Sequence, residues 1–310
     1  MIVTVTLNPA VDKALEVPGF EVGAHARAEV KSLLPAGKGV NVARGVCRLG
    51  GRAVAAGFVG VNERRMFAES LSADGAEAGF CTVEGRTRTN TTILDPRTRT
   101  TTHLRERGFT VSAGDLRALR RSLSYRLREH AGATLVWAGS LPPGMDGEDL
   151  GGVLEFCAAE GARLVLDTSG DPLRAAVNTG ALHAVKPNLR ELGQCLGREV
   201  ERADAAAAAR ELLDRVQVVL LTLGEEGAYF VSEEATIGRR CPLTEEEVGN
   251  LVGCGDAFLA GWLRGRERGE GAEEALCWAV AAGAASAAGD STVGYALEDV
   301  RRLLPRCQPI

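Results

Sequence analysis

Short runs of consecutive apolar residues alternate along this chain with longer segments of helical periodicity. The apolar runs predict strands at 2–7, 53–60, 133–139, 162–167, 182–186 and 216–222. The periodic segments predict helices at 39–50, 62–75, 112–130, 147–161 and 203–216. Apolar strands separated by helices are typical of a parallel sheet that is covered on both faces. We therefore expect an α/β fold with a mostly parallel central sheet.

Two segments, at 11–34 and 80–107, depart from this alternation. Both contain short polar runs rich in Thr, Arg and Val, with no helix between them, which is typical of antiparallel strands. We expect them to form a small sheet that projects from the main body as a lid. Because the chain contains no linker-like segment and no internal repeat, residues 1–310 are predicted to form a single α/β domain with this lid.

The composition excludes one class of function and leaves several others open. Of the 310 residues, 45% are hydrophobic and 25% are charged, which is ordinary for a globular protein with a substantial core. The net charge is -5, whereas nucleic-acid-binding proteins usually carry a basic face. We therefore expect no nucleic-acid partner.

Cysteine spacing and hydropathy bear on the location of the protein. No two of the eight cysteines have the C-x-x-C spacing of a zinc site or a redox pair. Scattered cysteines in a chain of this size predict reduced thiols and a cytoplasmic location. No apolar segment approaches the length of a membrane span, and the first residues resemble a strand and not a signal peptide. We expect no membrane partner.

Polar and glycine-rich loops repeatedly follow the predicted strands. They contain Asn8, Asp12, Ser140, Asp167, Lys186, Asn188, Glu191, Thr222, Gly224 and Gly227. In an open parallel sheet, ligands bind beyond the carboxyl ends of the strands, which share one edge. One large active site at that edge is the economical interpretation.

The segment NLVGCGDAFLAGWL, at 250–263, places glycines and a carboxylate at the start of a helical pattern. The first N–H groups of a helix lack intrahelical acceptors and carry a partial positive charge. Gly253, Cys254 and Gly255 could therefore surround a phosphate, and Asp256 beside them could accept a proton from an alcohol. An ordinary helix start would show the same pattern, and the P-loop signature is absent.

A second glycine-rich segment, PAGKGVNVARGV at 35–46, also precedes a helical pattern. Lys38 contributes a cation, and Asn41 falls in the first turn, where its amide could face a sugar hydroxyl. Taken alone, this segment also fits a loop that leads into an amphipathic helix. Two such clusters in one chain favour an anion-binding site.

Five motifs occur in order: NPAVD at 8–12, AGKGVNVA around residue 40, GSLPPG at 139–144, KPNLRE at 186–191 and VGCGDAFLAG at 252–261. With this order and spacing, the sequence resembles the phosphofructokinase-B branch of the ribokinase-like sugar kinases over essentially its whole length. The resemblance implies a ribokinase-like fold, ATP and Mg²⁺ as cofactors, and transfer of the γ-phosphate to a sugar hydroxyl. NPAVD and GSLPPG resemble the 1-phosphofructokinase and tagatose-6-phosphate kinase subgroup, whose acceptors already carry a phosphate.

The resemblance also implies roles for individual residues. Asp256 would be the catalytic base, beside an anion hole formed by the amides of Gly253, Cys254 and Gly255. The implied sugar-binding residues are Asp12, Gly37, Lys38, Asn41 and Ser140. The implied nucleotide-binding residues are Lys186, Asn188, Thr222, Gly224 and Gly227. Glu191 would bind Mg²⁺ through water, and pairing of lid sheets between subunits would give a homodimer.

Some positions depart from the family pattern. Ala36 stands where the family usually has the first of two glycines before the lysine, and Cys254 replaces a common alanine. In the run THLRERG, His103 and Arg105 stand where the family has Glu and Asn. These departures concern the identity of the sugar more than the reaction.

In the lid segment GRTRTNTTILD, a strand of period two places Arg86, Arg88, Asn90 and Thr92 on one face. Arg88 and Asn90 match the family's R-x-N, in which the arginine binds the substrate phosphate. A guanidinium fork suits a phosphate because it donates two parallel hydrogen bonds. The other interpretation is a solvated edge strand whose charges prevent aggregation.

The sequence therefore predicts an ATP- and Mg²⁺-dependent kinase of phosphorylated hexoses, with fructose 1-phosphate as the first expected substrate. Fructose 6-phosphate and tagatose 6-phosphate follow. A kinase of an unphosphorylated sugar or nucleoside is the alternative if Arg88 points away from the cleft. A sugar-phosphate sensor without activity is the third hypothesis, against which the presence of Asp256, Asn188 and Glu191 argues.

Overall fold

The computed structural model describes residues 1–310, which form two sheets and ten α-helices. The strands of the larger sheet are β1 (Ile2–Thr6), β4 (Ala53–Gly60), β5 (Glu77–Val83), β8 (Thr134–Ala138), β9 (Arg163–Asp167), β10 (Ala184–Val185), β11 (Val218–Thr222), β12 (Ala228–Val231), β13 (Thr236–Arg240) and β14 (Gln308–Pro309). In space they follow the order β14-β13-β12-β11-β10-β9-β8-β1-β4-β5. From β11 through to β5 they pair in parallel, and β12, β13 and β14 extend the sheet antiparallel.

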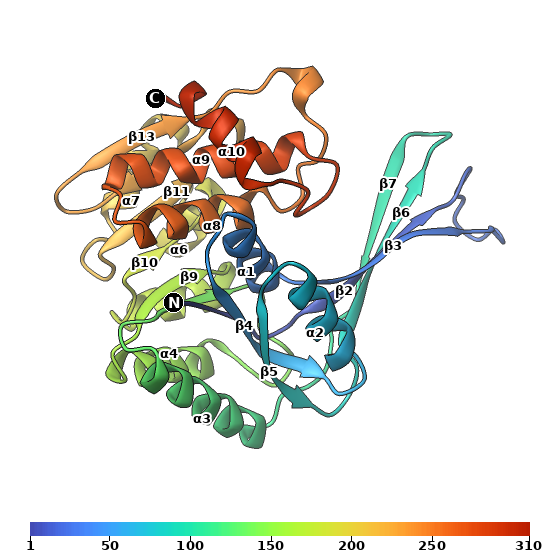
Figure 1. Cartoon of the computed structure of the whole chain (residues 1–310), viewed down its shortest axis with the longest axis horizontal. Helices are drawn as coiled ribbons and strands as arrows, with labels where there is room; N and C mark the ends of the chain where they lie inside the picture. Colours follow the sequence, from blue (N-terminus) through green and yellow to red (C-terminus); the bar gives the residue numbers. More distant parts are fainter.

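Helices cover both faces of this sheet (Figure 1). One face carries α1 (Lys38–Arg48), α2 (Arg64–Ala73), α8 (Cys254–Glu267), α9 (Ala272–Ala288) and α10 (Leu297–Leu303). The other face carries α3 (Ala113–Glu129), α4 (Gly147–Ala159), α5 (Gly170–Asn178), α6 (Leu189–Leu196) and α7 (Ala205–Arg210). Short 3-10 turns lie at Arg202–Asp204, Gly224–Glu226, Glu245–Glu247 and Leu304–Arg306. The expected α/β architecture, with helices on both faces of a mostly parallel sheet, is confirmed.

The central strands are apolar along their whole length because both of their faces are covered. Strands β1 and β4 are buried at every residue. Along β1, Ile2 enters the hydrophobic core beneath α1 and α8, whereas Val3 and Val5 enter the core beneath α3 and α4. The sheet therefore separates two cores, and this explains the uninterrupted apolar runs in the sequence. No helix combines the length and the hydrophobicity needed to cross a lipid bilayer.

The apolar pattern did not predict several short or antiparallel elements, nor the 17-residue helix α9, which is rich in alanine and buried along most of its length. The helices α5 and α6 have 9 and 8 residues, and α5 begins with the sequence GDP, which carries little helical signal. The expected helix at 203–216 is a helix only through Arg210, after which the chain continues in i→i+3 turns to Leu213. Strands β12, β13 and β14 were not predicted at all.

The small sheet consists of β2 (Ala10–Glu16), β3 (Glu29–Ala36), β6 (Arg88–Asp95) and β7 (Thr100–Arg105), in the order β3-β2-β6-β7. It projects from the body on one side (Figure 1). The pairs β2–β3 and β6–β7 are antiparallel, but the central pair β2–β6 is parallel, so the antiparallel expectation was only partly right. Strand β2 continues β1 and β6 follows β5, and both leave a parallel sheet at the same edge, so they run side by side in the same direction.

The structure also revises the extent of the lid that the sequence predicted at 11–34 and 80–107. Residues 80–83 lie in β5 and pair with β4 of the larger sheet, so they do not belong to the lid. The two lid hairpins are joined at the far end by Asp95, whose carboxylate accepts hydrogen bonds from the amides of Gly19 (2.8 Å), Phe20 (3.0 Å) and Arg97 (2.9 Å). These backbone donors lower the pKa of Asp95 to about 2.

Helices α1 and α8 cross at a glycine, which lets their backbones approach closely. A Cβ atom on Gly45 would lie 2.5 Å from the hydroxyl of Tyr295 and 2.8 Å from Cβ of Ala260. Both distances are shorter than side chains tolerate, so any larger residue must push the two helices apart. This contact sets how closely α1 and α8 pack against each other.

We predict that Gly45→Val lowers the free energy of unfolding by about 1–3 kcal/mol, because overpacking forces a backbone shift. Gly152→Ala in α4 is the matched control. A Cβ atom there meets only the guanidinium end of Arg120, at 3.2 Å, and glycine is a poor helix former. The control should unfold at or above the wild-type urea midpoint. Equal urea midpoints for the two variants would show that a larger side chain fits between α1 and α8 without displacing them.

Candidate active site

The start of α8 has the geometry of an anion site. Gly253 caps the helix with φ 88°, and a Cβ atom there would lie 2.8 Å from the carbonyl oxygen of Thr292, so only glycine fits. The amides of Cys254 and Gly255, in the first turn, donate to no acceptor in the chain. Unpaired amides at the positive end of a 14-residue helix attract negative charge.

Asp256 is the buried carboxylate beside these amides. It is 6% exposed, and its Oδ2 accepts a hydrogen bond from Nδ2 of Asn41 at 2.8 Å. Burial and the negative charge of Asp167 raise the pKa of Asp256 to about 6, although Lys38, Asn41 and Lys186 act in the opposite direction. A carboxylate with this pKa is ionised at neutral pH and is a better proton acceptor than an ordinary aspartate.

Asp167, at the end of β9, holds two lysines. Its side chain is completely buried, and Oδ1 accepts a hydrogen bond from Nζ of Lys38 at 2.8 Å. Nζ of Lys186 lies 3.2 Å from Oδ2. Burial raises the pKa of Asp167, but the two lysines outweigh burial and hold this pKa below its ordinary value. Burial lowers the pKa of Lys38, and the charge of Asp167 more than reverses that effect.

This ion-paired cluster lies directly against the start of α8 and the loop after β8. A Cβ atom on Gly255 would lie 3.5 Å from Nζ of Lys186. Gly139 donates its amide to the carbonyl of Asp167 (2.9 Å), and a Cβ atom there would lie 3.9 Å from Cβ of Lys38. The carboxyl ends of β8, β9 and β10 and the starts of α1 and α8 therefore meet at one place.

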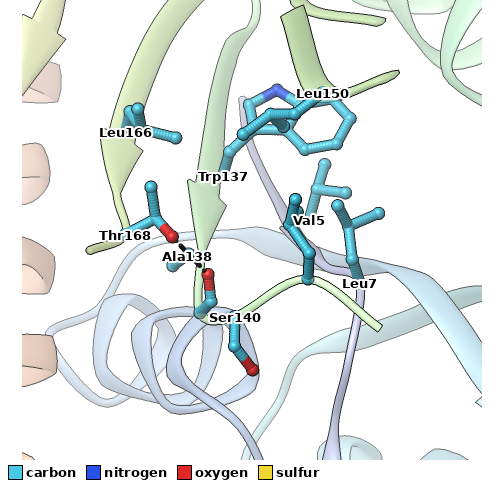
Figure 2. Close-up of a pocket in the computed structure, with 10 residues that line it drawn as sticks. Val5, Leu7, Trp137, Ala138, Ser140, Leu150, Leu166 and Thr168 are labelled. Atoms are coloured by element: carbon cyan, nitrogen blue, oxygen red, sulfur yellow. Dashed lines mark hydrogen bonds between the residues drawn. The ribbon is translucent and has the colours of Figure 1, made fainter. Parts of the chain in front are cut away.

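A small cavity lies behind the loop after β8. It has a volume of about 10 Å³ and is lined mainly by apolar side chains, among them Val5, Trp137 and Leu166. Figure 2 shows that a hydrogen bond of 2.8 Å from Thr168 to the carbonyl of Gly139 lies at one end of it, next to Ser140. The cavity holds at most one water molecule, so it is a packing gap and not a ligand site.

The lid contributes a second polar group of residues. Asp12 and Asn90 are directly opposite in the β2–β6 register, and Nδ2 of Asn90 donates to Oδ1 of Asp12 at 2.9 Å. Arg105 of β7 is opposite Asn90, so it lies in the same row. His103 instead pairs with Thr92, at 3.1 Å between Nδ1 and the hydroxyl.

Arg88 points from the lid toward the loops of the body. Its Nη2 donates to the carbonyl of Asn8 at 2.9 Å and lies 3.5 Å from the hydroxyl of Ser140, and its Nε donates to the carbonyl of Pro9 at 3.3 Å. Its Nη1 donates to no atom of the chain. The guanidinium also lines an open hollow of about 680 Å³ at the base of the lid, together with Arg107. Two N–H groups of Arg88 therefore remain available to an anion.

The expected nucleotide residues lie at the ends of β10 and β11. Asn188 caps α6, because its side-chain oxygen accepts a hydrogen bond from the backbone amide of Glu191 at 2.9 Å. In return, the backbone amide of Asn188 donates to the carboxylate of Glu191 at 2.9 Å. The amide of Thr222 donates to the carbonyl of Pro187 at 3.0 Å. Gly224 begins the turn after β11. The structure thus places these residues side by side and shows that Asn188 and Glu191 also stabilise a helix start.

Two of the expected residues have local reasons for their identity. A Cβ atom on Gly227 would lie 2.3 Å from the carbonyl oxygen of Arg239, so packing against β13 alone requires glycine. The thiol of Cys254 lies 3.6 Å from the carbonyl of Asn250, and burial raises the pKa of this thiol. Only the backbone of Cys254 faces the anion site. Gly37 caps α1, where a Cβ atom would lie 3.3 Å from Cα of Pro9.

Asp167 lies at the end of a predicted strand, but no sequence motif indicates a role for it. Its signal was a carboxylate that terminates the otherwise apolar strand RLVLD. The structure shows that this carboxylate joins Lys38 to Lys186 and raises the pKa of Asp256. Asp167 is therefore the residue around which the predicted residues are arranged.

The site fits a nucleotide with a divalent cation. No group of three or more His, Cys, Asp and Glu side chains has the arrangement of a metal site. A cation that binds with ATP needs only one or two protein carboxylates, because the phosphates supply further oxygens. Glu191 and Asp256 both lie near enough to Lys38 to affect its pKa. The unpaired amides of α8 and the buried ammonium of Lys186 complement phosphate oxygens.

A buried carboxylate beside unpaired helix-start amides, under a small sheet that projects from an α/β body, defines the site of a ribokinase-like sugar kinase. The chain belongs to the pfkB family of carbohydrate kinases, whose model matches residues 5–296. It is 35% identical to the 1-phosphofructokinase of Xanthomonas campestris over 84% of this chain and 82% of that protein. It is 32% identical to the 1-phosphofructokinase of Bacillus subtilis over 98% of both chains.

A solved structure shares the fold over nearly the whole length. Phosphofructokinase-2 from Escherichia coli, in complex with potassium, superposes with a TM-score of 0.91. The two sequences are 28% identical, and the match covers 98% of each chain. The ribokinase-like fold expected from the sequence is confirmed by this likeness.

We predict that Asp167→Asn lowers the free energy of unfolding by about 3 kcal/mol at pH 7, because it leaves the buried Lys186 without its counter-charge. The folded pKa of Asp167 lies below the unfolded value of about 4. The carboxylate therefore stabilises the fold above that pH and loses this contribution as the pH falls through the folded value. Urea unfolding should show the variant to be less stable than wild type throughout pH 8 to pH 5, and the difference should become smaller below about pH 4.

Asp171→Asn is the control for this experiment. Its carboxylate is 87% exposed and pairs with Arg174 on the surface, so the change should stay within about 0.5 kcal/mol. If Asp167→Asn were no more destabilising than Asp171→Asn, the two lysines would not depend on Asp167.

Proposed function

We propose that this protein transfers the γ-phosphate of ATP, bound with Mg²⁺, to a free hydroxyl of fructose 1-phosphate. The observation that carries the proposal is the position of Asp256, a buried carboxylate of raised pKa next to the unpaired amides of α8. Phosphoryl transfer needs a proton acceptor for the alcohol and fixed positive charge around the phosphoryl oxygens. Asp256 and the first turn of α8 provide both.

Asp256 and its partner Asn41 position the sugar hydroxyl in this proposal. The amide of Asn41 holds Oδ2 of Asp256, which leaves Oδ1 free to accept the proton of the alcohol. The raised pKa of Asp256 increases its basicity, while the carboxylate is still ionised at neutral pH. The amides of Gly253, Cys254 and Gly255 then stabilise the negative charge on the transferring group.

The remaining positive charge comes from the ion-paired lysines. Lys186 is buried and lies beside Gly255, so it neutralises phosphate oxygens of the nucleotide. Thr222, Gly224 and Gly227 form the adjoining turns and contact the nucleotide. Mg²⁺ would neutralise the charge of the phosphates, and Glu191 would hold it through water next to Asn188. Lys38 is 40% exposed and would reach the sugar or the γ-phosphate.

Fructose 1-phosphate is supported by the relatives named 1-phosphofructokinase and by the direction of Arg88. This guanidinium faces Ser140 and the loop after β1, and part of it is unpaired. A substrate phosphate would satisfy the free N–H groups, and Asp12 and Asn90 would bind hydroxyls of the sugar. Fructose 6-phosphate and tagatose 6-phosphate carry the same groups and are the next candidates.

Two other functions explain less of the site. A kinase of an unphosphorylated sugar or nucleoside would leave the free N–H groups of the inward-facing Arg88 without an acceptor. A sensor without activity would have no need of a buried carboxylate of raised pKa. Arg105, which stands in the row of Asp12 and Asn90, adds a further cation near the sugar.

We also propose that two copies of the chain pair through their lids. The edge strands β3 and β7 expose the apolar side chains of Val30, Leu33, Leu34 and Leu104, each at least 45% accessible. Exposed edge strands with apolar side chains are favourable surfaces for pairing with another chain. The edge strands β3 and β7 project away from the body along their outer parts (Figure 1).

Asp256→Asn should lower kcat by about 10²–10⁴-fold with little change in the KM for ATP, because the amide keeps the shape but accepts no proton. The wild-type kcat/KM should fall about tenfold per pH unit below about pH 6, as protonation removes the base. A coupled ATPase assay with fructose 1-phosphate measures both. Asp115→Asn, also in the first turn of a helix, should retain full activity. Retained turnover in Asp256→Asn would exclude this residue as the base.

Arg88→Ala should lower kcat/KM for fructose 1-phosphate by about tenfold to a hundredfold, because it removes a charge-assisted contact worth roughly 1.5–3 kcal/mol. Any activity with free fructose should hardly change, since that substrate has no phosphate. The ratio of the two activities, in wild type and variant, is the quantity to measure. Arg97→Ala, at the exposed far end of the lid, is the control and should leave this ratio unchanged.

Equal losses with both substrates, or none with either, would favour the kinase of an unphosphorylated sugar. The same assay with fructose 6-phosphate and tagatose 6-phosphate ranks the three phosphorylated acceptors. This ranking tests fructose 1-phosphate separately from the phosphotransfer reaction.

A further inference from the structure

Three cysteines come together at the edge of the larger sheet, on the opposite side of the body from the lid (Figure 1). Cys241 follows β13 and Cys307 precedes β14, and these strands pair antiparallel with Arg240 opposite Gln308. One further step in this register places Cys241 opposite Cys307. Residues opposite each other in an antiparallel pair have Cα atoms about 4.5–5.5 Å apart, within the range that a disulfide spans.

Cys277, on α9, completes this group, which we call the thiol cluster. Sγ of Cys307 lies 3.5 Å from the carbonyl oxygen of Cys277, and the neighbouring thiols of Cys241 and Cys277 raise the pKa of Cys307. Sγ of Cys241 lies 3.6 Å from the carbonyl of Leu303. Cys307 is thus the central thiol, with a neighbour on each side.

The three thiols differ in exposure and in charge environment. Cys241 is buried, whereas Cys277 and Cys307 are partly exposed. The guanidinium of Arg239, which pairs with Glu273, contributes positive charge near Cys277. The neighbouring Cys307 thiol and the charge of Arg239 lower the pKa of Cys277 to about 7, although burial acts in the opposite direction. A thiol that is partly ionised, partly accessible and next to a second thiol has the properties of a peroxide-sensitive cysteine.

We propose that Cys277 and Cys307 form a peroxide-responsive dithiol. The Cys277 thiolate attacks a hydroperoxide, the O–O bond breaks, and Cys277 becomes a sulfenic acid while the alkoxide or hydroxide leaves. The Cys307 thiol then attacks this sulfur, the S–O bond breaks, and water leaves with the proton of Cys307. The product is a disulfide between Cys277 and Cys307, and a dithiol reductant restores both thiols.

The disulfide would connect α9 to the C-terminal strand β14. In the reduced protein, β14 pairs with β13 over only two residues, so few hydrogen bonds hold it. The end of α9 also anchors the segment before α8, because the amides of Gly249 and Asn250 donate to the carbonyl of Ala287. The thiol cluster therefore lies in a different part of the fold from the kinase site. The two are connected through α9, which contains Cys277 and also holds the segment before α8.

Hydrogen peroxide at pH 7, applied to the full-length reduced protein, tests this inference. Peptide mapping after alkylation should identify a peptide that joins Cys277 to Cys307, with a mass 2 Da below that of the two thiol peptides. Dithiothreitol should reverse it. In Cys307→Ser, the sulfenic acid on Cys277 should persist and be trapped by dimedone.

Variants separate this dithiol from general oxidation. In Cys277→Ser, loss of the Cys307 thiol should slow by about tenfold, because an ordinary thiol is only a few per cent ionised at pH 7. Cys81→Ser is the control, since Cys81 is also partly exposed but burial raises its thiol pKa. It should leave the rate unchanged. The proposal would be overturned by a sulfinic acid on Cys277 with Cys307 still free, or by an unchanged rate in Cys277→Ser. The first of these outcomes is read from the peptide map of the wild type, so it can be tested even if a variant fails to fold.

Discussion

The buried carboxylate of Asp167 is the interaction on which the arrangement of the site depends. It lies at the end of β9 and pairs with Lys38 at the start of α1 and with Lys186 after β10. These elements belong to different parts of the chain, and an uncompensated charge at this depth would be strongly unfavourable. The ion-paired cluster therefore fixes the start of α1, and through Asn41 it fixes the orientation of Asp256.

Electrostatics and backbone geometry act together around this cluster. Burial and the charge of Asp167 raise the pKa of Asp256, whereas the lysines that Asp167 holds lower it, so Asp256 remains ionised at neutral pH with increased basicity. The glycine at 253 and the close crossing of α1 and α8 at Gly45 bring the unpaired amides to the same place. The negative charge of Asp256 next to an anion site would repel an anionic ligand. The positive charges of the two nearby lysines balance this repulsion.

The lid and the thiol cluster show how one sheet supports separate chemistries. The lid strands β2 and β6 extend from the carboxyl ends of the parallel strands, and this brings Asp12, Asn90 and Arg88 over the site. The thiol cluster lies at the antiparallel edge, where β13 and β14 meet α9. The first position belongs to the proposed substrate site, and the second contains the partly exposed thiols of Cys277 and Cys307.

The sequence by itself determined the alternation of buried strands and helices, the glycine-rich starts of α1 and α8, and the identity of Asp256 and Lys38 as chemical groups. These features depend on local periodicity and on motifs of a few residues. Only the tertiary structure decided the parallel pairing of β2 with β6, the direction of Arg88, the role of Asp167 and the meeting of Cys241, Cys277 and Cys307. The reason is physical: Asp167 pairs with a lysine 129 residues away, and Asp256 with an asparagine 215 residues away. Such contacts arise when the sheet folds and buries their charges together, and no local pattern encodes them.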